Sequence, residues 1–229
     1  MKKIIALGGG ELKAKTTLAV DEYIAGLAKA RAGEKRAYGL FLGTASHDSL
    51  PYFNSFRKIY TSVFDVKADV ALTVYGEMDF KHIEEKFLKA DLIYAGGGDT
   101  LFMLSKWREK GLLPLIKDAY ERGVILAGVS AGAICWFSDM YTDSDSMNGG
   151  EEYRLEKGLG WLGGLMTPHY NERREDFVKA FAASSFEEAY AAEDNCALEF
   201  TDGKFVRAFG TGAGYRLKKA GGAVSEERL

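Results

Sequence analysis

The sequence predicts an α/β fold, a mostly parallel sheet with helices on both faces. Two observations predict it: short apolar runs alternate with amphipathic segments up to about residue 128, and several of these runs end in glycine. Alternation of this kind produces βαβ units, whose parallel strands are buried on both faces. With 47% hydrophobic and 28% charged residues, the 229-residue chain has the composition of a packed globular protein.

The first strand is expected at Lys3–Leu7, because this apolar run ends directly in three glycines. A helix over residues 17–30 is expected because Leu18, Ile24 and Leu27 recur at helical intervals behind a threonine. The same reasoning predicts strands at 37–42, 70–75, 92–95 and 124–128 and helices at 50–63, 80–88, 100–107 and 115–120.

The pattern changes after His169. A helix over residues 172–183 precedes four short apolar segments, and Asp202-Gly203 is a typical hairpin turn. The segments lie at 189–192, 196–200, 205–209 and 214–217. We therefore expect antiparallel hairpins at the C-terminal end of the sheet, a loosely held tail at 221–229, and a single domain over 1–229.

Small residues gather where strands end, at Gly8–Gly10, Gly96–Gly98 and Gly128. In open parallel sheets ligands bind beyond the carboxyl ends of the strands, so these glycines indicate a crevice. The alternative is that they serve only tight turns with positive φ.

The strongest local motif is Gly128-Val129-Ser130-Ala131-Gly132, which lies between the last predicted parallel strand and an apolar helix. A G-x-S-x-G nucleophile elbow requires this strand-turn-helix context. Ser130 is therefore a candidate nucleophile, and its alternative role is that of an ordinary helix N-cap.

A serine hydroxyl needs a neighbouring base, and the chain has three histidines. His82 lies in a charged helical stretch and is expected at the surface, while His47 fits a loop. His169, in Met166-Thr167-Pro168-His169-Tyr170, follows a stretch of small residues that can end as a strand at the crevice. We expect His169 to be the base.

A third group should orient the imidazole. The polar loop over 138–152 carries Asp139, Asp143 and Asp145, and we favour Asp143, with Asp145 as the alternative, in the order Ser, Asp, His. The alternative is that these aspartates are solvated loop residues without a catalytic role.

An oxyanion hole needs two N–H donors, which amides of the glycine turn at 96–98 and Ala131 can supply. A phosphate-binding turn is the alternative. The chain lacks both G-x-G-x-x-G and G-x-x-x-x-G-K-[ST], which argues against nucleotide binding.

Charge and composition exclude other classes. The 30 Lys and Arg residues face 33 Asp and Glu residues, a net charge of -3, so nucleic acid is not an expected partner. An apolar run of about 18 residues, the length needed to span a membrane, is not found. The apolar run at Ile4–Leu7 is too short for a signal peptide, so a cytoplasmic location is expected. Without CxxC or HExxH spacing, no metal is expected.

An α/β-hydrolase shares the elbow, but its histidine comes late in the chain, whereas His169 follows Ser130 closely. Three motifs together resemble the peptidase E family of serine exopeptidases, which includes aspartyl dipeptidases and, more distantly, cyanophycinases. They are Gly-Gly-Gly-Asp-Thr at 96–100, Gly-Val-Ser-Ala-Gly-Ala at 128–133, and Pro-His-Tyr at 168–170 with Glu-Arg-Arg-Glu at 172–175.

The resemblance implies a fold similar to class I glutamine amidotransferases and the removal of N-terminal aspartate from short peptides, without a cofactor. It implies Ser130 as nucleophile and His169 as base, and an arginine beyond the histidine as partner of the substrate carboxylate. By this analogy the oxyanion donors are Gly97, Gly98 and Ala131, and the substrate-binding candidates are Arg173, Arg174 and Asp99.

Two other functions stay open. One is a related amidase or isopeptidase with another specificity, and the other is a binding module that holds an acidic metabolite without catalysis. The expected partner is a small peptide, and the chain is expected to be a monomer or a homodimer.

Overall fold

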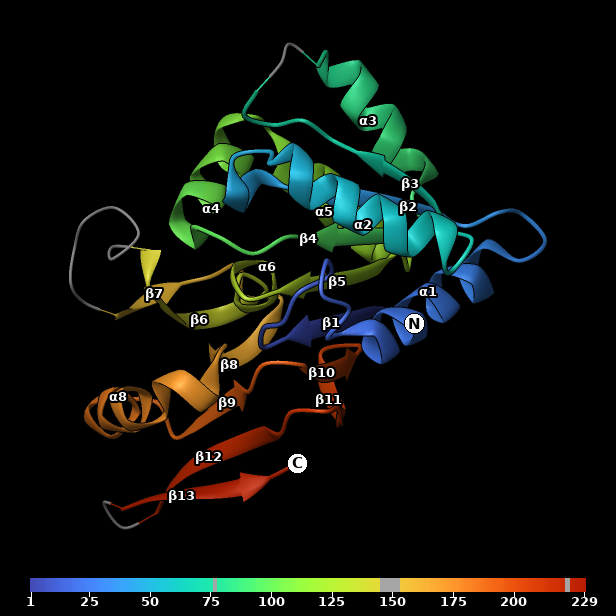
Figure 1. Cartoon of the computed structure of the whole chain (residues 1–229). Coiled ribbons are helices and arrows are strands. Elements are labelled where there is room, and N and C mark those ends of the chain that lie inside the picture. The colour runs from blue at the N-terminus through green and yellow to red at the C-terminus, as the bar shows by residue number, and fades with distance from the viewer. Residues whose placement is uncertain (76–77, 145–152, 221–222) are drawn as a thin grey trace.

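The computed structural model describes residues 1–229 apart from 76–77, 145–152 and 221–222. The described residues form two sheets, shown in Figure 1. The seven-stranded sheet has the order β11-β10-β1-β5-β4-β2-β3. Its strands are β1 (Lys3–Leu7), β2 (Tyr38–Leu42), β3 (Lys67–Val70), β4 (Leu92–Ala95), β5 (Ile125–Val129), β10 (Cys196–Thr201) and β11 (Lys204–Gly210).

Five strands of this sheet, β1 to β5, are parallel, whereas β10 and β11 pair antiparallel at one edge. This arrangement confirms the predicted fold class. The central strands β2, β4 and β5 are buried throughout because helices cover both faces of the sheet. The strand predicted at 70–75 instead lies at Lys67–Val70. It pairs with β2 from Tyr38, which lies opposite Lys67, to Phe41, which lies opposite Val70.

Helices pack on the two faces of the seven-stranded sheet (Figure 1). On one face, α1 (Leu18–Ala32) and α2 (Leu50–Ser62) enclose an apolar core with β1, β2 and β4. On the other face lie α3 (Phe80–Lys89), α4 (Thr100–Glu109) and α5 (Leu112–Glu121). The short helices η1 (Thr44–Ser46) and α6 (Ala131–Ile134) follow β2 and β5. The apolar helix expected after Ser130 is thus only one turn long.

The second sheet has six strands in the order β13-β12-β9-β8-β6-β7, and α8 (Tyr170–Ala183) covers it. Its strands are β6 (Phe137–Thr142), β7 (Arg154–Lys157), β8 (Leu162–Thr167), β9 (Glu188–Ala192), β12 (Gly214–Ala220) and β13 (Ala223–Arg228). Two expectations are corrected here. Residues 138–142, predicted as loop, belong to β6, and residues 223–228, predicted as a loose tail, pair with β12.

The two sheets share one apolar cluster, which joins Ile4 and Leu126 to Met140 and Met166. The chain passes back from the second sheet to the first through the short turn between β9 and β10. As a result, the ends of β1, β5, β8 and β9 meet in one region (Figure 1). Within the described part of the chain, every helix is too short or too polar to cross a membrane.

Candidate active site

Ser130 occupies a strained turn between β5 and α6. Its φ of 52° and ψ of −114° lie outside the regions that residues with a side chain normally adopt. The flanking glycines permit this crossing: a Cβ on Gly128 would lie 2.0 Å from the carbonyl oxygen of Gly132, and one on Gly132 would lie 2.1 Å from that of Ala95. A strained residue between a strand and a helix, with glycines on both sides, is the context that a nucleophile elbow requires.

His169 follows β8 and begins α8 in the left-handed region, with φ 49° and ψ 42°. Its amide donates to the carbonyl of Gly8 at 2.9 Å, which ties the end of β8 to the end of β1. His169 Nε2 lies 2.9 Å from Ser130 Oγ. The structure therefore brings together the serine and the histidine selected from the sequence. His47, in contrast, packs on Phe102 with the ring centroids 4.1 Å apart.

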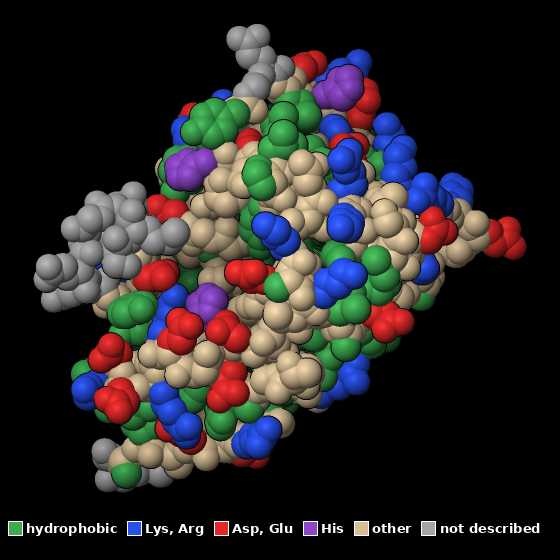
Figure 2. All heavy atoms as spheres, viewed as in Figure 1, with side chains coloured by type: hydrophobic (Ala, Val, Ile, Leu, Met, Phe, Trp, Pro, Cys, Tyr) green, Lys and Arg blue, Asp and Glu red, His purple; other side chains and the backbone are tan. Residues whose placement is uncertain are grey.

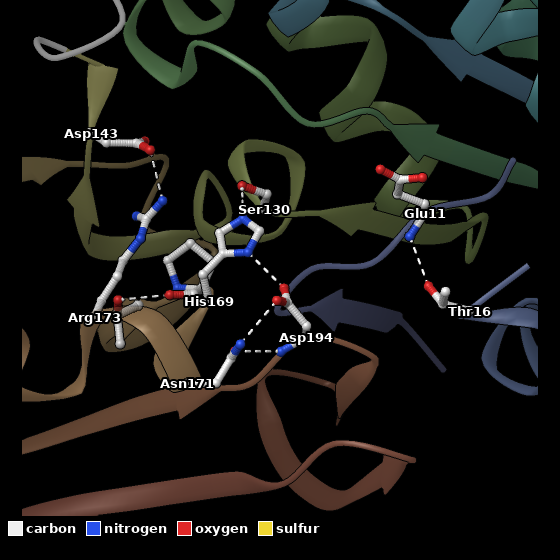
Figure 3. Close-up of polar contacts among 10 residues, drawn as sticks. Glu11, Thr16, Ser130, Asp143, His169, Asn171, Arg173 and Asp194 are labelled. Atoms are coloured by element: carbon white, nitrogen blue, oxygen red, sulfur yellow. Dashed lines mark hydrogen bonds and ion pairs between the residues drawn. The ribbon is translucent and has the colours of Figure 1, made fainter. Parts of the chain in front are cut away.

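The carboxylate beside the imidazole is Asp194, in the turn between β9 and β10. Its Oδ1 lies 2.7 Å from His169 Nδ1 (Figure 3). Asn171 holds it from the other side, since Asn171 Nδ2 donates to Asp194 Oδ2 at 3.1 Å and the Asp194 amide donates to Asn171 Oδ1 at 2.9 Å. A carboxylate only accepts hydrogen bonds, so this contact places the proton on Nδ1 and leaves Nε2 to accept from the serine.

The expectation for Asp143 is corrected. Asp143 Oδ2 instead accepts a hydrogen bond from Arg173 Nη2 at 2.7 Å, while both ring nitrogens of His169 face Ser130 and Asp194. The physical reason is that Asp143, the residue directly after β6, lies against Arg173 in the first turn of α8. The alternative, Asp145, lies outside the described residues. The order along the chain is thus Ser, His, Asp.

The first glycine turn makes room for the imidazole and the carboxylate. A Cβ on Gly9 would lie 1.8 Å from Asp194 Oδ1 and 2.6 Å from His169 Nδ1. The same turn is hydrogen-bonded to the segments that carry both side chains. The carbonyl of Gly8 accepts from the His169 amide at 2.9 Å, and the carbonyl of Gly9 accepts from the Asn195 amide at 3.1 Å. The sequence contained this signal as three consecutive glycines at a strand end, but it does not say which side chains need the space.

Among the expected oxyanion donors, the Gly97 amide donates to the hydroxyl of Tyr52 at 3.2 Å. The amides of Gly98 and Ala131 donate to no acceptor among the described residues. Gly97 borders Ser130, since a Cβ on Gly97 would lie 3.4 Å from Ser130 Cβ. Asp99, expected to bind substrate, instead caps α4 by accepting from the amide of Phe102 at 3.0 Å.

Arg173 and Arg174 differ in their surroundings. Arg173 is 5% exposed, stacks over Tyr153 at 4.8 Å, and has Nε and Nη1 without hydrogen-bond partners among the described residues. Figure 3 shows its guanidinium directed toward Asp143, on the side of Ser130 away from Asp194. Arg174 pairs with Glu226 at 2.5 Å and contacts the rings of Tyr170 and Tyr215.

Beside His169 lies an open hollow of about 370 Å³ that Glu11, Glu172 and Asp194 line. In the view of Figure 2, a histidine lies at mid-face with acidic side chains around it. A second hollow of about 300 Å³ shares Gly10 and Glu11 with the first, and Tyr52 is among the residues that line it. The described residues include no group of three or more His, Cys, Asp or Glu side chains suited to a metal ion.

A strained serine in contact with a histidine, which in turn contacts a carboxylate, defines the class of serine-dependent hydrolases. A model of Peptidase family S51 matches residues 4–208. The chain is 33% identical to the uncharacterized peptidase YgaJ of Bacillus subtilis (strain 168), over 99% of this chain and 96% of that protein. The chain therefore belongs to Peptidase family S51 and is a serine peptidase.

Further relatives agree with this assignment. Peptidase E of Salmonella typhi is 31% identical over 98 residues, which cover 40% of this chain and 43% of that protein. The crystal structure of a peptidase from an acI-B1 Actinobacterium has a TM-score of 0.74 at 17% identity, covering 100% of this chain and 94% of that one. A putative peptidase E from Listeria monocytogenes EGD-e has a TM-score of 0.64 at 20% identity and covers 100% and 99%. At these identities the structures support the fold alone.

Proposed function

We propose that this peptidase is an exopeptidase that removes N-terminal aspartate from short peptides through an acyl-enzyme on Ser130. One observation carries the proposal: the continuous contact from Ser130 Oγ through the His169 ring to Asp194, at 2.9 Å and 2.7 Å. Ser130 then acts as nucleophile, His169 as general base and acid, and Asp194 as the group that orients the imidazole.

In the first half of the reaction, Ser130 Oγ attacks the carbonyl carbon of the scissile peptide bond while His169 Nε2 takes the hydroxyl proton. Asp194 stabilises the resulting imidazolium through Nδ1–H. The electron pair of the carbonyl bond moves onto its oxygen, which accepts from the amides of Gly98 and Ala131. When the pair returns, the C–N bond breaks and His169 gives its proton to the departing amine.

In the second half, a water molecule takes the place of the amine. His169 removes one proton from this water, whose oxygen attacks the acyl carbon. Collapse of the second tetrahedral intermediate breaks the ester bond, His169 returns the proton to Ser130 Oγ, and free aspartate leaves. No redox step or outside co-reactant other than water is needed.

Arg173 is the residue we assign to the side-chain carboxylate of the substrate. Its buried guanidinium keeps Nε and Nη1 without partners among the described residues, so an N–H of this side chain is left to donate to a carboxylate beside Asp143. Arg174 is less suited, because its guanidinium pairs with Glu226 of β13 and packs over the rings of Tyr170 and Tyr215. The pairing of Arg173 with Asp143 is the observation that favours a second candidate, a related amidase or isopeptidase of other specificity.

Hydrolysis of Asp-X dipeptides and Asp-p-nitroanilide by the wild type and by Ser130→Ala tests the proposal. We expect turnover by the wild type and none above background in Ser130→Ala, with Ser105→Ala, at an exposed position in α4, as the matched control. Equal rates in wild type and Ser130→Ala would end the proposal. Covalent labelling of Ser130 by a fluorophosphonate, with Asp-X peptides untouched, would instead support the second candidate.

A further inference from the structure

The turn over residues 96–99 is tied to its surroundings through three of its four amides. The Gly96 amide donates to the carbonyl of Leu42 at 3.0 Å, and the Asp99 amide donates to that of Ala45 at 2.9 Å. The Gly97 amide donates to a side chain, the hydroxyl of Tyr52, at 3.2 Å. The Gly98 amide donates to no acceptor among the described residues. One N–H of the turn is therefore left available for a ligand.

This turn lies against the nucleophile. A Cβ on Gly97 would lie 3.4 Å from Ser130 Cβ and 3.3 Å from the carbonyl oxygen of Val129. Gly98 has a φ of +136°, and a Cβ on it would lie 2.2 Å from the carbonyl oxygen of Ala45. The turn is thus built of glycine because the backbone of η1 and the elbow approach it closely. Glycine has wide conformational freedom, so the orientation of the Gly97–Gly98 peptide depends on its hydrogen bonds.

Tyr52 is well suited to fix this peptide. It lies in the first turn of α2, its ring packs edge-on against Phe41 at 5.1 Å, and a Cβ on Gly96 would be 3.0 Å from its Cε1. Burial raises the pKa of Tyr52 to about 12, so its hydroxyl stays neutral near pH 7. Its oxygen accepts from the Gly97 amide, and Tyr52 also lines the hollow together with Gly10 and Lys13.

We propose that Tyr52 is a positioning residue of the oxyanion hole. Its hydroxyl holds the Gly97–Gly98 peptide so that the Gly98 N–H, together with the Ala131 N–H, faces the oxygen of the carbonyl that Ser130 attacks. Donors that are fixed before the reaction stabilise the developing negative charge without having to reorient. The hydrogen bond from Gly97 to Tyr52 would therefore lower the barrier by keeping the Gly98 N–H in place. The inference rests on the proposed acyl transfer by Ser130 and adds a residue that touches neither substrate nor nucleophile.

The experiment compares Tyr52→Phe with Tyr60→Phe. Both changes remove one tyrosine hydroxyl from α2, partly buried at Tyr52 and buried at Tyr60, but the hydroxyl of Tyr60 donates to Asp21, away from the glycine turn. For Tyr52→Phe we expect kcat on Asp-p-nitroanilide to fall about tenfold, less than the loss of an oxyanion donor itself. KM should stay within about twofold, because the contact acts mainly in the transition state.

Two further readouts separate positioning from a general structural role. The rate at which a fluorophosphonate labels Ser130 should slow in Tyr52→Phe by about the same factor as kcat, since the phosphonyl oxygen uses the same donors. The midpoints of the pH profile of kcat/KM should not move, because His169 and Asp194 keep their contacts. Tyr60→Phe should leave kcat, the labelling rate and the pH profile unchanged while it lowers the melting temperature.

The outcomes are distinguishable. Equal kcat and equal labelling in Tyr52→Phe and the wild type would overturn the inference and leave the proposed function standing. A higher kcat in Tyr52→Phe would also overturn it, because it would mean that the hydroxyl competes with substrate for the Gly97 amide. If the wild type neither hydrolyses amides nor reacts with the fluorophosphonate, the proposed function fails and the role of Tyr52 fails with it.

Discussion

The two sheets position their catalytic candidates by different means. In the seven-stranded sheet, Ser130 is fixed by close backbone packing, because a Cβ on Gly128 would meet Gly132 of the same turn and a Cβ on Gly132 would meet Ala95 of β4. On the side of the six-stranded sheet, His169 and Asp194 are held by hydrogen bonds between segments distant in sequence, through the Gly8–Gly10 turn and Asn171. The position of Ser130 therefore depends on the backbone around it, whereas that of His169 depends on contacts that a single polar substitution can remove.

Replacement of Asp194 is expected to have the largest effect. In Asp194→Asn the amide can donate to His169 Nδ1, which stabilises the tautomer that carries its proton on Nε2 and cannot accept from Ser130. We expect kcat to fall about 10³- to 10⁴-fold with little change in melting temperature, as for a triad acid replaced by its amide. Steady-state hydrolysis of the peptide substrate measures this effect.

Asp143→Asn is the matched comparison, because it makes the same change in the residue that pairs with Arg173. We expect kcat to stay within about tenfold and the main effect to fall on KM and stability, since a buried arginine loses part of its ion pair. A large loss of kcat in Asp143→Asn together with a small one in Asp194→Asn would contradict the assignment of Asp194.

Gly9→Ala is expected to have the second largest effect. The added methyl group would lie within 1.8 Å of Asp194 Oδ1 and 2.6 Å of His169 Nδ1, so both side chains must move. We expect kcat/KM to fall at least about 10²-fold, because displacement of the base by about 1 Å costs that much. Gly26→Ala, in α1 with nothing within 4 Å of the new Cβ, provides the control. Full activity in Gly9→Ala would show that the imidazole tolerates displacement.

The same contrast explains what could be predicted from the sequence. The parallel sheet, Ser130 and its flanking glycines follow from short-range patterns, and His169 could be selected because it is the one histidine at a suitable strand end. Asp194 could not, because its role depends on the antiparallel pairing of β10 with β1, which brings the β9–β10 turn beside Gly9. Several acidic residues lie nearer to Ser130 in sequence, and local chemistry does not separate them. The second sheet was missed for a similar reason, since β6 has polar residues that only pairing with β7 and β8 accommodates.

Asn171→Ala is expected to have a smaller effect. The change removes both hydrogen bonds that hold Asp194 from the side away from His169, but leaves the contact between His169 and Asp194. We expect kcat to fall about tenfold, as is typical when a supporting hydrogen bond beside a catalytic group is lost. The variant Asn171→Asp keeps the acceptor for the Asp194 amide but adds a second carboxylate, so it should be less active than Asn171→Ala. Wild-type kcat in both variants would exclude a supporting role.

The smallest effect on activity is expected for Asp21→Asn, which tests the local side of the comparison. Asp21 is 1% exposed and accepts hydrogen bonds from Thr17 Oγ1 at 2.7 Å and from the Tyr60 hydroxyl at 2.9 Å, in the core beside α1. Burial raises its pKa from 3.8 to about 6. The folded protein thus binds this proton more tightly than the unfolded chain does. The contribution of Asp21 to stability is full below about pH 3.8 and is lost as the pH rises through about 6.

Asparagine does not titrate, and Thr17 can turn its hydroxyl to accept from the new amide. The difference in free energy of unfolding between Asp21→Asn and the wild type should therefore shift in favour of the variant between pH 4 and 7, by about 3 kcal/mol for two pKa units. Urea unfolding at a series of pH values measures this difference, and kcat measured at pH 7 should be unchanged. Parallel stability profiles would show that Asp21 is ionised at the same pH in the folded and unfolded chains. A loss of kcat would instead show that the apolar core beneath α1 influences the position of Ser130. That result would contradict the view that the backbone around Ser130 alone fixes its position.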